Sequence, residues 1–327
     1  RTLGALGGIV ASRVAREFHI GGPSHSISSE ETSGLRALEV AVRALQNREL
    51  DVALAGAVDL NGDLRTLLTT DAARLYSRDG TIPGEGAACV VLKRLGDARR
   101  DGDRIYAVVR DIGTAAASAP VQPIEAADAD VGHAGAASGL VSFVKASLCL
   151  QHEVIPRLRE GGAPRYWVRN RADGPRRAGV SSAGVMGERI HVVLEGVESG
   201  RNPAPRPHPK VPLPPPAANR PSPGRIAFVF PGSGNQFGDM GRELALQWPE
   251  ILRLQDGENA RLASQMRVEE FWNGPLTAEV LADHRALICG QVTFGTMVAD
   301  LAMHFGLKPD AAIGYSLGES TALLALR

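Results

Sequence analysis

The first part of the chain alternates between two hydrophobic patterns. Apolar residues recur at helical spacing from Leu35 to Leu45, and the short apolar run DVALAGAV at 51–58 is typical of a buried strand. Helices that alternate with buried strands predict a layered α/β domain. The other elements that we expect here are strands over 89–92, 105–109 and 190–194, and a helix over 139–150.

A second segment repeats the α/β pattern behind a proline-rich stretch. Ten of the twenty-one prolines fall between Pro203 and Pro223, where extended polyproline geometry is favoured and helix is excluded, so this stretch is predicted to be a semi-rigid linker. Beyond it we expect strands over 225–230 and 311–314 and a helix over 291–305. The predicted organisation is a first domain over 1–197, a linker over 198–224 and a second domain over 225–327.

Charge and cysteine usage narrow the classes of partner. Thirty-six Lys and Arg balance thirty-six Asp and Glu, so no excess positive charge is present to bind nucleic acid or an anionic membrane. No run of eighteen uninterrupted apolar residues occurs, and we expect no transmembrane span. Cys89, Cys149 and Cys289 lie far apart among apolar neighbours, which predicts buried, reduced thiols, no metal site and a cytoplasmic protein.

Ser316 lies in the motif GYSLG at 314–318, which fits the pattern G-x-S-x-G. Small residues on both sides let a strand turn sharply into a helix and expose the serine oxygen as a nucleophile. The amide of Leu317 can then face the oxyanion of a tetrahedral intermediate, where the helix dipole favours negative charge. On this motif alone, an ordinary strand-turn-helix passage and an α/β-hydrolase both remain open.

A second glycine-rich loop, FPGSGNQ at 230–236, makes the reading more specific, because it can supply the other oxyanion donor. The two loops together resemble the FPGQGSQ and GHSxGE motifs of acyltransferase domains in type I polyketide synthases and multifunctional fatty-acid synthases. Ser233 stands where that family has glutamine, which leaves a backbone donor, and Tyr315 stands where it has histidine. The resemblance predicts the first third of an α/β-hydrolase-like acyltransferase domain.

The resemblance implies that Ser316 takes an acyl group, malonyl in the first instance, from coenzyme A and passes it to the phosphopantetheine thiol of an acyl carrier protein. It implies no other cofactor and no metal. The family's histidine base and its carboxylate-binding arginine are expected downstream of Arg327, so the fragment alone is expected to be inert. His284 and His304 do not occupy the position of that base.

The first segment resembles β-ketoacyl synthases in several ordered stretches, which implies a thiolase-like, layered α/β/α/β/α fold. The stretch GPSHSISSEETSGL at 22–35 is similar to the element GPSxxVDTACSSSL, in which a cysteine carries the acyl chain. On that pattern Glu31 stands at the cysteine position. Further similar stretches are the strand at 51–58, GEGAACVVLKRL at 84–95, VGHAGAASG at 131–139, and GVSS and HVVLE at 179–182 and 191–195.

The residues of condensation are mostly missing from this ketosynthase-like segment. Of the family's two histidines only His133 has a counterpart, and the lysine that precedes the second histidine aligns with Asp128. The residues between 102 and 133 are also much fewer than in the family, so the first histidine is either absent or left out of this sequence. For Glu31 we expect a capping box with Ser28, or cavity filling, and for His133 a structural role. A malonyl decarboxylase is the catalytic alternative.

The cysteine-free pattern SSEETSG resembles the chain-length factor of polyunsaturated fatty-acid synthases, an inactive ketosynthase-like domain that pairs with a catalytic one. The implied partners are acyl carrier protein domains and a catalytic ketosynthase or a second ketosynthase-like copy, in a pseudo-twofold dimer through 51–58. The chain starts at Arg1 without a methionine and stops inside a helical run, so we expect a piece of a multidomain synthase. A non-catalytic scaffold, in which both domains are degenerate, is the remaining alternative.

Overall fold

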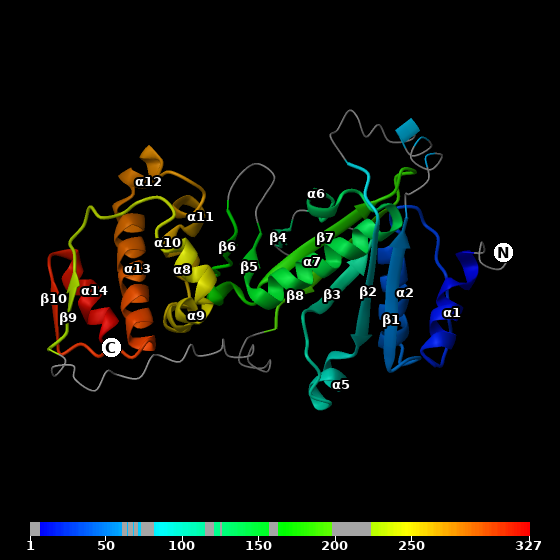
Figure 1. Cartoon of the computed structure of the whole chain (residues 1–327), viewed down its shortest axis with the longest axis horizontal. Coiled ribbons are helices and arrows are strands. Elements are labelled where there is room, and N and C mark those ends of the chain that lie inside the picture. Colours follow the sequence, from blue (N-terminus) through cyan, green and yellow to red (C-terminus); the bar gives the residue numbers. More distant parts are fainter. Residues whose placement is uncertain are drawn as a thin grey trace, which may run out of the picture. The chain divides into compact units, whose positions relative to one another are not determined.

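A computed structural model describes residues 7–60, 64, 68, 71–72, 82–114, 121–124, 126–156, 163–197 and 224–327 (Figure 1). The chain divides into two compact units, which are described separately below. Unit 1 consists of Arg1–His152 and Arg176–Pro203, and unit 2 consists of Glu153–Pro175 and Ala204–Arg327. The predicted linker over 198–224 lies outside the described residues, except for Gly224.

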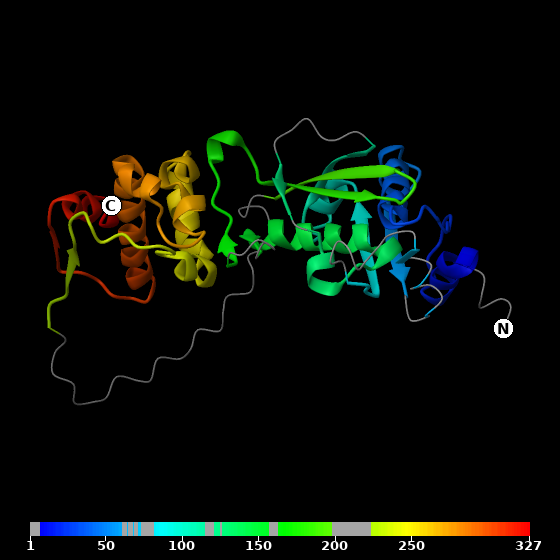
Figure 2. The same ribbon diagram turned by 90° about the horizontal axis from the view of Figure 1, so that it is seen from above.

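The core of unit 1 forms around helix α2 (Ser33–Gln46) and helix α7 (Ser138–His152). Leu35 and Leu38, from the predicted helical stripe, are fully buried. Helix α2 contacts strand β1, whereas α7 contacts strands of two different sheets, β2 and β7, and therefore lies between them (Figure 2). The helix that was predicted over 139–150 is confirmed with slightly wider bounds.

An antiparallel pair of strands and a mixed four-stranded sheet complete unit 1. Strand β1 (Val52–Asp59) pairs with β2 (Gly86–Lys93). The other sheet has the order β3-β8-β7-β4, in which only β4 runs parallel to its neighbour. Its first strand begins three residues after the predicted start at 105. The bounds of its strands are β3 (Val108–Gly113), β4 (Gln122–Pro123), β7 (Arg177–Ala183) and β8 (Arg189–Glu195).

The prediction that 51–58 is a buried strand is correct for only one of its two faces. Side chains alternate along a strand, and α2 covers the face that carries Ala53 and Ala55. On the opposite face Val52, Leu54 and Val91 are each more than 40% exposed. The prediction that all three cysteines are buried is also wrong: Cys89, on β2, is exposed, Cys289 is partly buried, and only Cys149 is buried, all three as free thiols.

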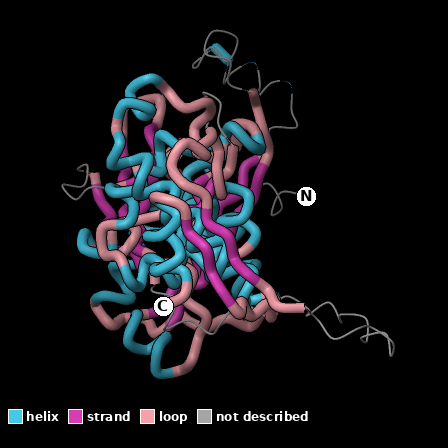
Figure 3. The backbone as a smooth tube through the Cα atoms, turned by 90° about the vertical axis from the view of Figure 1, so that its left-hand side faces the viewer, coloured by secondary structure: helices cyan, strands magenta, loops and turns pink. Residues whose placement is uncertain are grey.

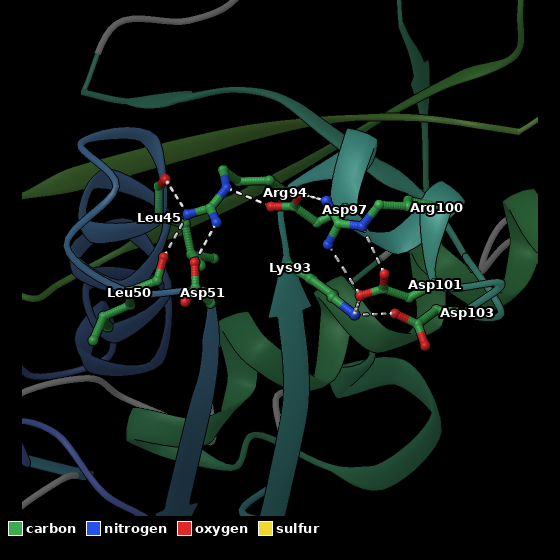
Figure 4. A network of polar contacts seen from close by, with 9 residues as sticks. All are labelled: Leu45, Leu50, Asp51, Lys93, Arg94, Asp97, Arg100, Asp101 and Asp103. Carbon is green, nitrogen blue, oxygen red and sulfur yellow. Dashed lines mark hydrogen bonds and ion pairs between the residues drawn. The ribbon is translucent and has the colours of Figure 1, made fainter.

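A network of charged side chains ties the outer end of β2 to the loop between α2 and β1 (Figure 4). Arg94 donates to the carbonyl of Leu50 at 2.6 Å and pairs with Asp51 at 2.5 Å and Asp97 at 2.6 Å. The neighbouring Lys93 pairs with carboxylates that follow α5 (Leu95–Arg100). The guanidinium therefore satisfies a loop carbonyl and two carboxylates at once, which fixes the register of β1 against β2. The shorter elements of unit 1 are Gly7–Ile9, α1 (Val10–Glu17), α6 (Asp128–Val131) and Gly135–Ala137.

Unit 2 contains a two-stranded parallel sheet, whose strands lie toward the viewer in Figure 3, and a long helix, which is labelled in Figure 1. Strand β9 (Ala227–Phe230) pairs with β10 (Ala311–Gly314), as expected for both strands. Helix α13 (His284–His304) begins seven residues before its predicted start, because Asp283 caps it by accepting hydrogen bonds from the amides of Arg285 and Ala286. The other helices are α8 (Arg242–Gln247), α9 (Pro249–Glu258), α10 (Leu262–Met266), α11 (Val268–Phe271), α12 (Ala278–Ala282) and α14 (Leu317–Ala325).

Helix α13 is long and apolar enough to cross a membrane by length and composition, which differs from the expectation that no such segment occurs. In unit 2 it serves as a core helix. Phe294 and Met297 belong to the buried cluster of this unit, and α13 contacts α9, α10, α12 and α14. The polar side chains of Gln291 and Asp300 are buried along it.

The structure differs from the predicted domain boundaries in one respect, because 153–175 belongs to unit 2. Strands β5 (Val154–Ile155) and β6 (Arg165–Tyr166) pair within this segment, and Arg171–Asp173 forms a short helical turn. Tyr166 is 1% exposed in the cluster that also holds Trp272. Glu153 accepts a hydrogen bond from Arg253 at 2.7 Å. Apolar burial and a largely buried ion pair therefore hold residues 153–175 in unit 2. The proline-rich stretch, from which the domain boundary was predicted, could not indicate this.

We expect Leu38→Ala to destabilise unit 1 by about 2–5 kcal/mol, because the fully buried side chain leaves a cavity between α2 and its neighbours. Unfolding in urea should be followed by circular dichroism and by tryptophan fluorescence, since Trp167, Trp248 and Trp272, the three tryptophans, all lie in unit 2. The circular-dichroism transition should move to lower urea while the fluorescence transition stays. Val40→Ala, at a position 45% exposed on the same helix, is the control, and an equal shift in both variants would contradict the assignment of this core.

Candidate functional site

In unit 1, the structure brings Glu31 and His133 together although 102 positions separate them in sequence. The Nε2 atom of His133 lies 3.0 Å from Oε1 of Glu31, and Nδ1 lies 2.7 Å from Oδ2 of Asp128. The side chain of His133 is 4% exposed, and that of Glu31 is 12% exposed. His133 thus lies between two carboxylates, and one of them, Glu31, stands at the position where the resemblance puts an acyl-carrying cysteine.

Loops from several elements position this cluster. The amide of His133 donates to the carbonyl of Ile82 at 2.7 Å, and the amide of Gly84 donates to the carbonyl of His133 at 3.0 Å. Gly84 is needed for this approach, because a Cβ atom there would lie 2.4 Å from the Val131 carbonyl oxygen. On the other side, the hydroxyl of Ser182 donates to the backbone carbonyl of Glu31 at 2.9 Å. The loop before β2, the loop before α7 and the end of β7 therefore meet at Glu31 and His133.

The two carboxylates control the charge of His133. The hydrogen bond to Asp128 is the largest cause that raises the pKa of His133, and the hydrogen bond to Glu31 is the next. Together they raise this pKa from 6.5 to about 9, although burial of the imidazole lowers it. The imidazole is therefore protonated at neutral pH, and both of its N–H groups already donate to carboxylates. An imidazolium in this state can neither accept a proton as a general base nor offer a free N–H group to a substrate carbonyl.

The predicted capping box at Ser28 and Glu31 is wrong. Helix α2 begins at Ser33 with Thr32 as N-cap, so Glu31 precedes the helix and its carboxylate turns toward His133. A structural role was expected for His133. In the structure, its imidazole ring contacts the carboxylates of Asp128 and Glu31. Asp128 aligns with the lysine of the β-ketoacyl synthase pattern, and no role was predicted for it. The only available signal was a carboxylate five residues before a histidine.

In unit 2, Ser316 has the strained backbone of a nucleophile at a sharp turn. It lies between β10 and α14 with φ 54° and ψ −116°, a conformation that non-glycine residues rarely adopt and that clusters at active sites. The turn is possible because both flanking residues are glycines. A Cβ atom on Gly314 would lie 2.4 Å from the amide nitrogen of Glu319, and one on Gly318 would lie 2.1 Å from the Phe230 carbonyl oxygen. Ser316 itself is exposed.

The second predicted loop begins beside this serine. Strands β9 and β10 are parallel and pair Phe230 with Gly314, so the loops that follow them start at the same edge of the sheet. The amide of Tyr315 donates to the carbonyl of Phe230 at 3.1 Å, which joins the two loops. Among the described residues, neither the Ser233 amide nor the Leu317 amide donates a backbone hydrogen bond in a turn, loop or cap. Both predicted oxyanion donors are thus available at one edge.

The part of unit 2 that the structure describes supplies no base for Ser316. His304 lies at the C-terminal end of α13 with its ring against Phe305, and His284 lies at the other end of that helix. Among the described contacts, neither histidine has a hydrogen bond to Ser316. The described residues also contain no group of three histidine, cysteine or acidic side chains that could bind a metal ion.

We expect the Glu31–His133–Asp128 cluster to make the stability of unit 1 depend on pH. Because the folded-state pKa of His133 is raised from 6.5 to about 9, its contribution of about 3 kcal/mol is complete below pH 6.5 and is lost as pH rises to 9. Urea unfolding followed by circular dichroism from pH 6 to 9.5 measures this loss. His133→Gln keeps hydrogen-bonding capacity without the charge and should flatten the profile, and a parallel decline in both proteins would contradict the assignment.

Comparison with known proteins identifies relatives of the first unit. Residues 1–98 match the family model of the β-ketoacyl synthase N-terminal domain, and residues 101–161 match that of the C-terminal domain. The chain is 26% identical to the polyketide synthase GfsA of Streptomyces halstedii over an alignment of 491 positions, which covers 98% of this chain and 6% of that protein. It is 30% identical to the phthioceranic/hydroxyphthioceranic acid synthase of Mycobacterium tuberculosis (strain H37Rv) over 59% of this chain and 13% of that protein.

Solved structures give the same result for the fold. The ketosynthase from module 6 of the bacillaene synthase from Bacillus subtilis 168 matches 60% of this chain and 52% of its own with a TM-score of 0.52 and 23% identity. This likeness concerns the fold alone. The chain spans only 6% to 18% of the length of the curated relatives that it matches. The alignment of 491 positions also exceeds the 327 residues present, so GfsA carries stretches without a counterpart here.

The ordered motifs, the two family models and the fold agree for unit 1. They do not extend the assignment to an acyltransferase or to a chain-length factor. The chain therefore contains a segment related to the β-ketoacyl synthases, of the type found in modular polyketide synthases.

Proposed function

We propose that this chain is a portion of a cytoplasmic multidomain polyketide or fatty-acid synthase, in which Ser316 accepts an acyl group from coenzyme A. The observation that carries the proposal is the strained backbone of Ser316 at the start of α14, beside the unoccupied amides of Leu317 and Ser233. Strain of this kind is retained where function needs it. Two amide donors beside an exposed hydroxyl are the elements of an acyl-transfer site.

In the proposed reaction, the Ser316 hydroxyl oxygen adds to the thioester carbonyl of malonyl-CoA. The carbonyl oxygen becomes an oxyanion, which the Ser233 and Leu317 amides stabilise. Collapse of this intermediate breaks the carbon–sulfur bond, and coenzyme A leaves as a thiol that takes up the proton lost from the serine through a general base. The phosphopantetheine thiol of an acyl carrier protein then attacks the seryl ester in the reverse sense, so the carrier is the proposed partner.

For the ketosynthase-like domain we propose a role that supports chain elongation without condensation. A carboxylate at position 31 cannot form the thioester that carries the chain, and His133 is held as an imidazolium by two acids. This combination supports a chain-length-factor type of domain that pairs with a catalytic ketosynthase or a second copy. The same charge argument disfavours a malonyl decarboxylase, since no N–H of His133 is left for the substrate.

A scaffold without catalysis is the second candidate. Tyr315 and Ser233 depart from the acyltransferase motifs, and the Tyr315 ring lies against Gly232, where a Cβ atom would come within 2.9 Å of it. If the tyrosine narrows the approach to Ser316, both domains serve only to hold neighbouring domains in place. Labelling of Ser316 separates the two candidates.

We expect the full-length protein to gain the mass of one malonyl group after brief incubation with malonyl-CoA. Ser316→Ala should abolish the gain because the hydroxyl is the attacking group, whereas Ser320→Ala, one turn along α14 and also exposed, should retain it. Intact-protein mass spectrometry followed by peptide mapping measures the adduct and locates it.

Glu31→Gln is the matched variant for the other domain and should leave the adduct unchanged. If the folded wild type forms no adduct, the acyltransferase proposal fails and the scaffold takes its place. Adduct formation that depends on Glu31 would instead place the chemistry in the ketosynthase-like domain.

A further inference from the structure

We propose that Gln291 is a positioning residue for acyl transfer at Ser316: by binding the Gly232 carbonyl, it fixes the direction of the Ser233 amide. The inference rests on the proposed acyltransferase function and assigns a role to a residue outside both glycine-rich motifs. Gln291 lies on α13, and its side chain is 8% exposed.

The Gly232 carbonyl oxygen receives two side-chain hydrogen bonds. Nε2 of Gln291 donates from α13, and Nδ2 of Asn235 donates from the same loop at 2.9 Å. A carbonyl oxygen has two lone pairs, so these two donors fill its capacity. Burial of an amide side chain such as Gln291 costs free energy unless it is hydrogen-bonded, and the Gly232 carbonyl is the partner that its Nε2 donates to.

The geometry of the peptide bond transmits this contact to Ser233. The Gly232 carbonyl and the Ser233 amide belong to one planar peptide group, and in a trans peptide the two point in opposite directions. The described residues contain no cis peptide bond. Rotation of the Ser233 amide therefore requires the loss of both hydrogen bonds to Gly232. The donor is thus oriented before the substrate binds, which is what stabilisation of a developing oxyanion requires.

Rigid packing holds Gln291 and the loop in place. A Cβ atom on Gly295 would lie 2.6 Å from the methyl group of Thr321, so α13 and α14 approach closely one turn beyond Gln291. On the other side of the loop, a Cβ atom on Gly232 would lie 3.1 Å from the carbonyl oxygen of Tyr315, the residue before the nucleophile. The same helix thus contacts the element that carries Ser316 and the loop that carries Ser233.

The test is the rate of Ser316 malonylation in the full-length protein, measured by rapid-quench mass spectrometry over a range of malonyl-CoA concentrations. Loss of one oxyanion donor costs about 100- to 1,000-fold in rate, and a misdirected donor should cost less, so we expect Gln291→Ala to lower the maximal rate by about 10- to 100-fold. The half-saturating concentration should change by less than about twofold, because the ground-state carbonyl needs the amide far less than the oxyanion does. Gln291→Glu keeps the size of the side chain but loses the N–H donor, and it should show the same loss.

The control is Ile288→Ala, at a position 46% exposed on the same helix, which should retain the wild-type rate. A wild-type rate in Gln291→Glu would overturn the inference while leaving the acyltransferase function intact. A loss of rate with a matching rise in half-saturating concentration, or with a lower tryptophan-fluorescence unfolding midpoint in both Gln291 variants, would assign Gln291 a purely structural role. No adduct in the wild type would instead remove the proposed function itself.

Discussion

An ion pair between His133 and Glu31, the residue that precedes Thr32 and helix α2, joins two distant loops of unit 1. Burial of the Glu31 charge without a counter-charge costs several kcal/mol, so a protonated His133 must face it. A protonated imidazole has a second N–H group, and Asp128 accepts from that group. Asp128 and His133 come from one segment and Glu31 from another, 102 positions away, so the cluster joins two distant parts of the chain.

The two sites differ in whether their hydrogen-bonding capacity is filled. In unit 1, each ring nitrogen of His133 has a carboxylate partner, so the cluster stabilises the fold and leaves little for a ligand. In unit 2, the opposite holds, because Ser316 is strained and exposed and the nearby amides of Ser233 and Leu317 have no described acceptor. A filled site in a ketosynthase-related domain and an open site in the following domain support different roles for the two.

Packing, more than chain continuity, decides where the units separate. The proline-rich stretch suggested one division after residue 197, and most of the chain follows it. Residues 153–175 nevertheless belong to unit 2, because Tyr166 enters its hydrophobic cluster and Glu153 pairs with Arg253. A proline-rich composition predicts where the chain forms a linker. It does not predict whether a segment ahead of that linker packs in the core of the first unit or of the second.

Elements that depend on local patterns could be predicted from the amino-acid sequence. Apolar periodicity located α2, α7, β1 and β10 to within about two residues, and the glycines of GYSLG predicted the turn at Ser316, because close backbone approach permits no side chain there. Ordered motifs also carried the relationship to ketosynthases. The start of α13 was missed, since Asp283 caps it ahead of the apolar stretch that marked the helix.

Features that depend on contacts between distant residues could not be predicted from the sequence. Glu31 pairs with His133, and Gln291 donates a hydrogen bond to the Gly232 carbonyl, although no local pattern relates these positions. The exposure of one face of β1 and β2 likewise depends on which elements pack against the sheet. The physical reason is that burial and hydrogen bonding depend on which atoms meet after folding. The hydrophobic periodicity of a helix or strand predicts which of its side chains are buried. It does not predict which residues of other elements those side chains contact.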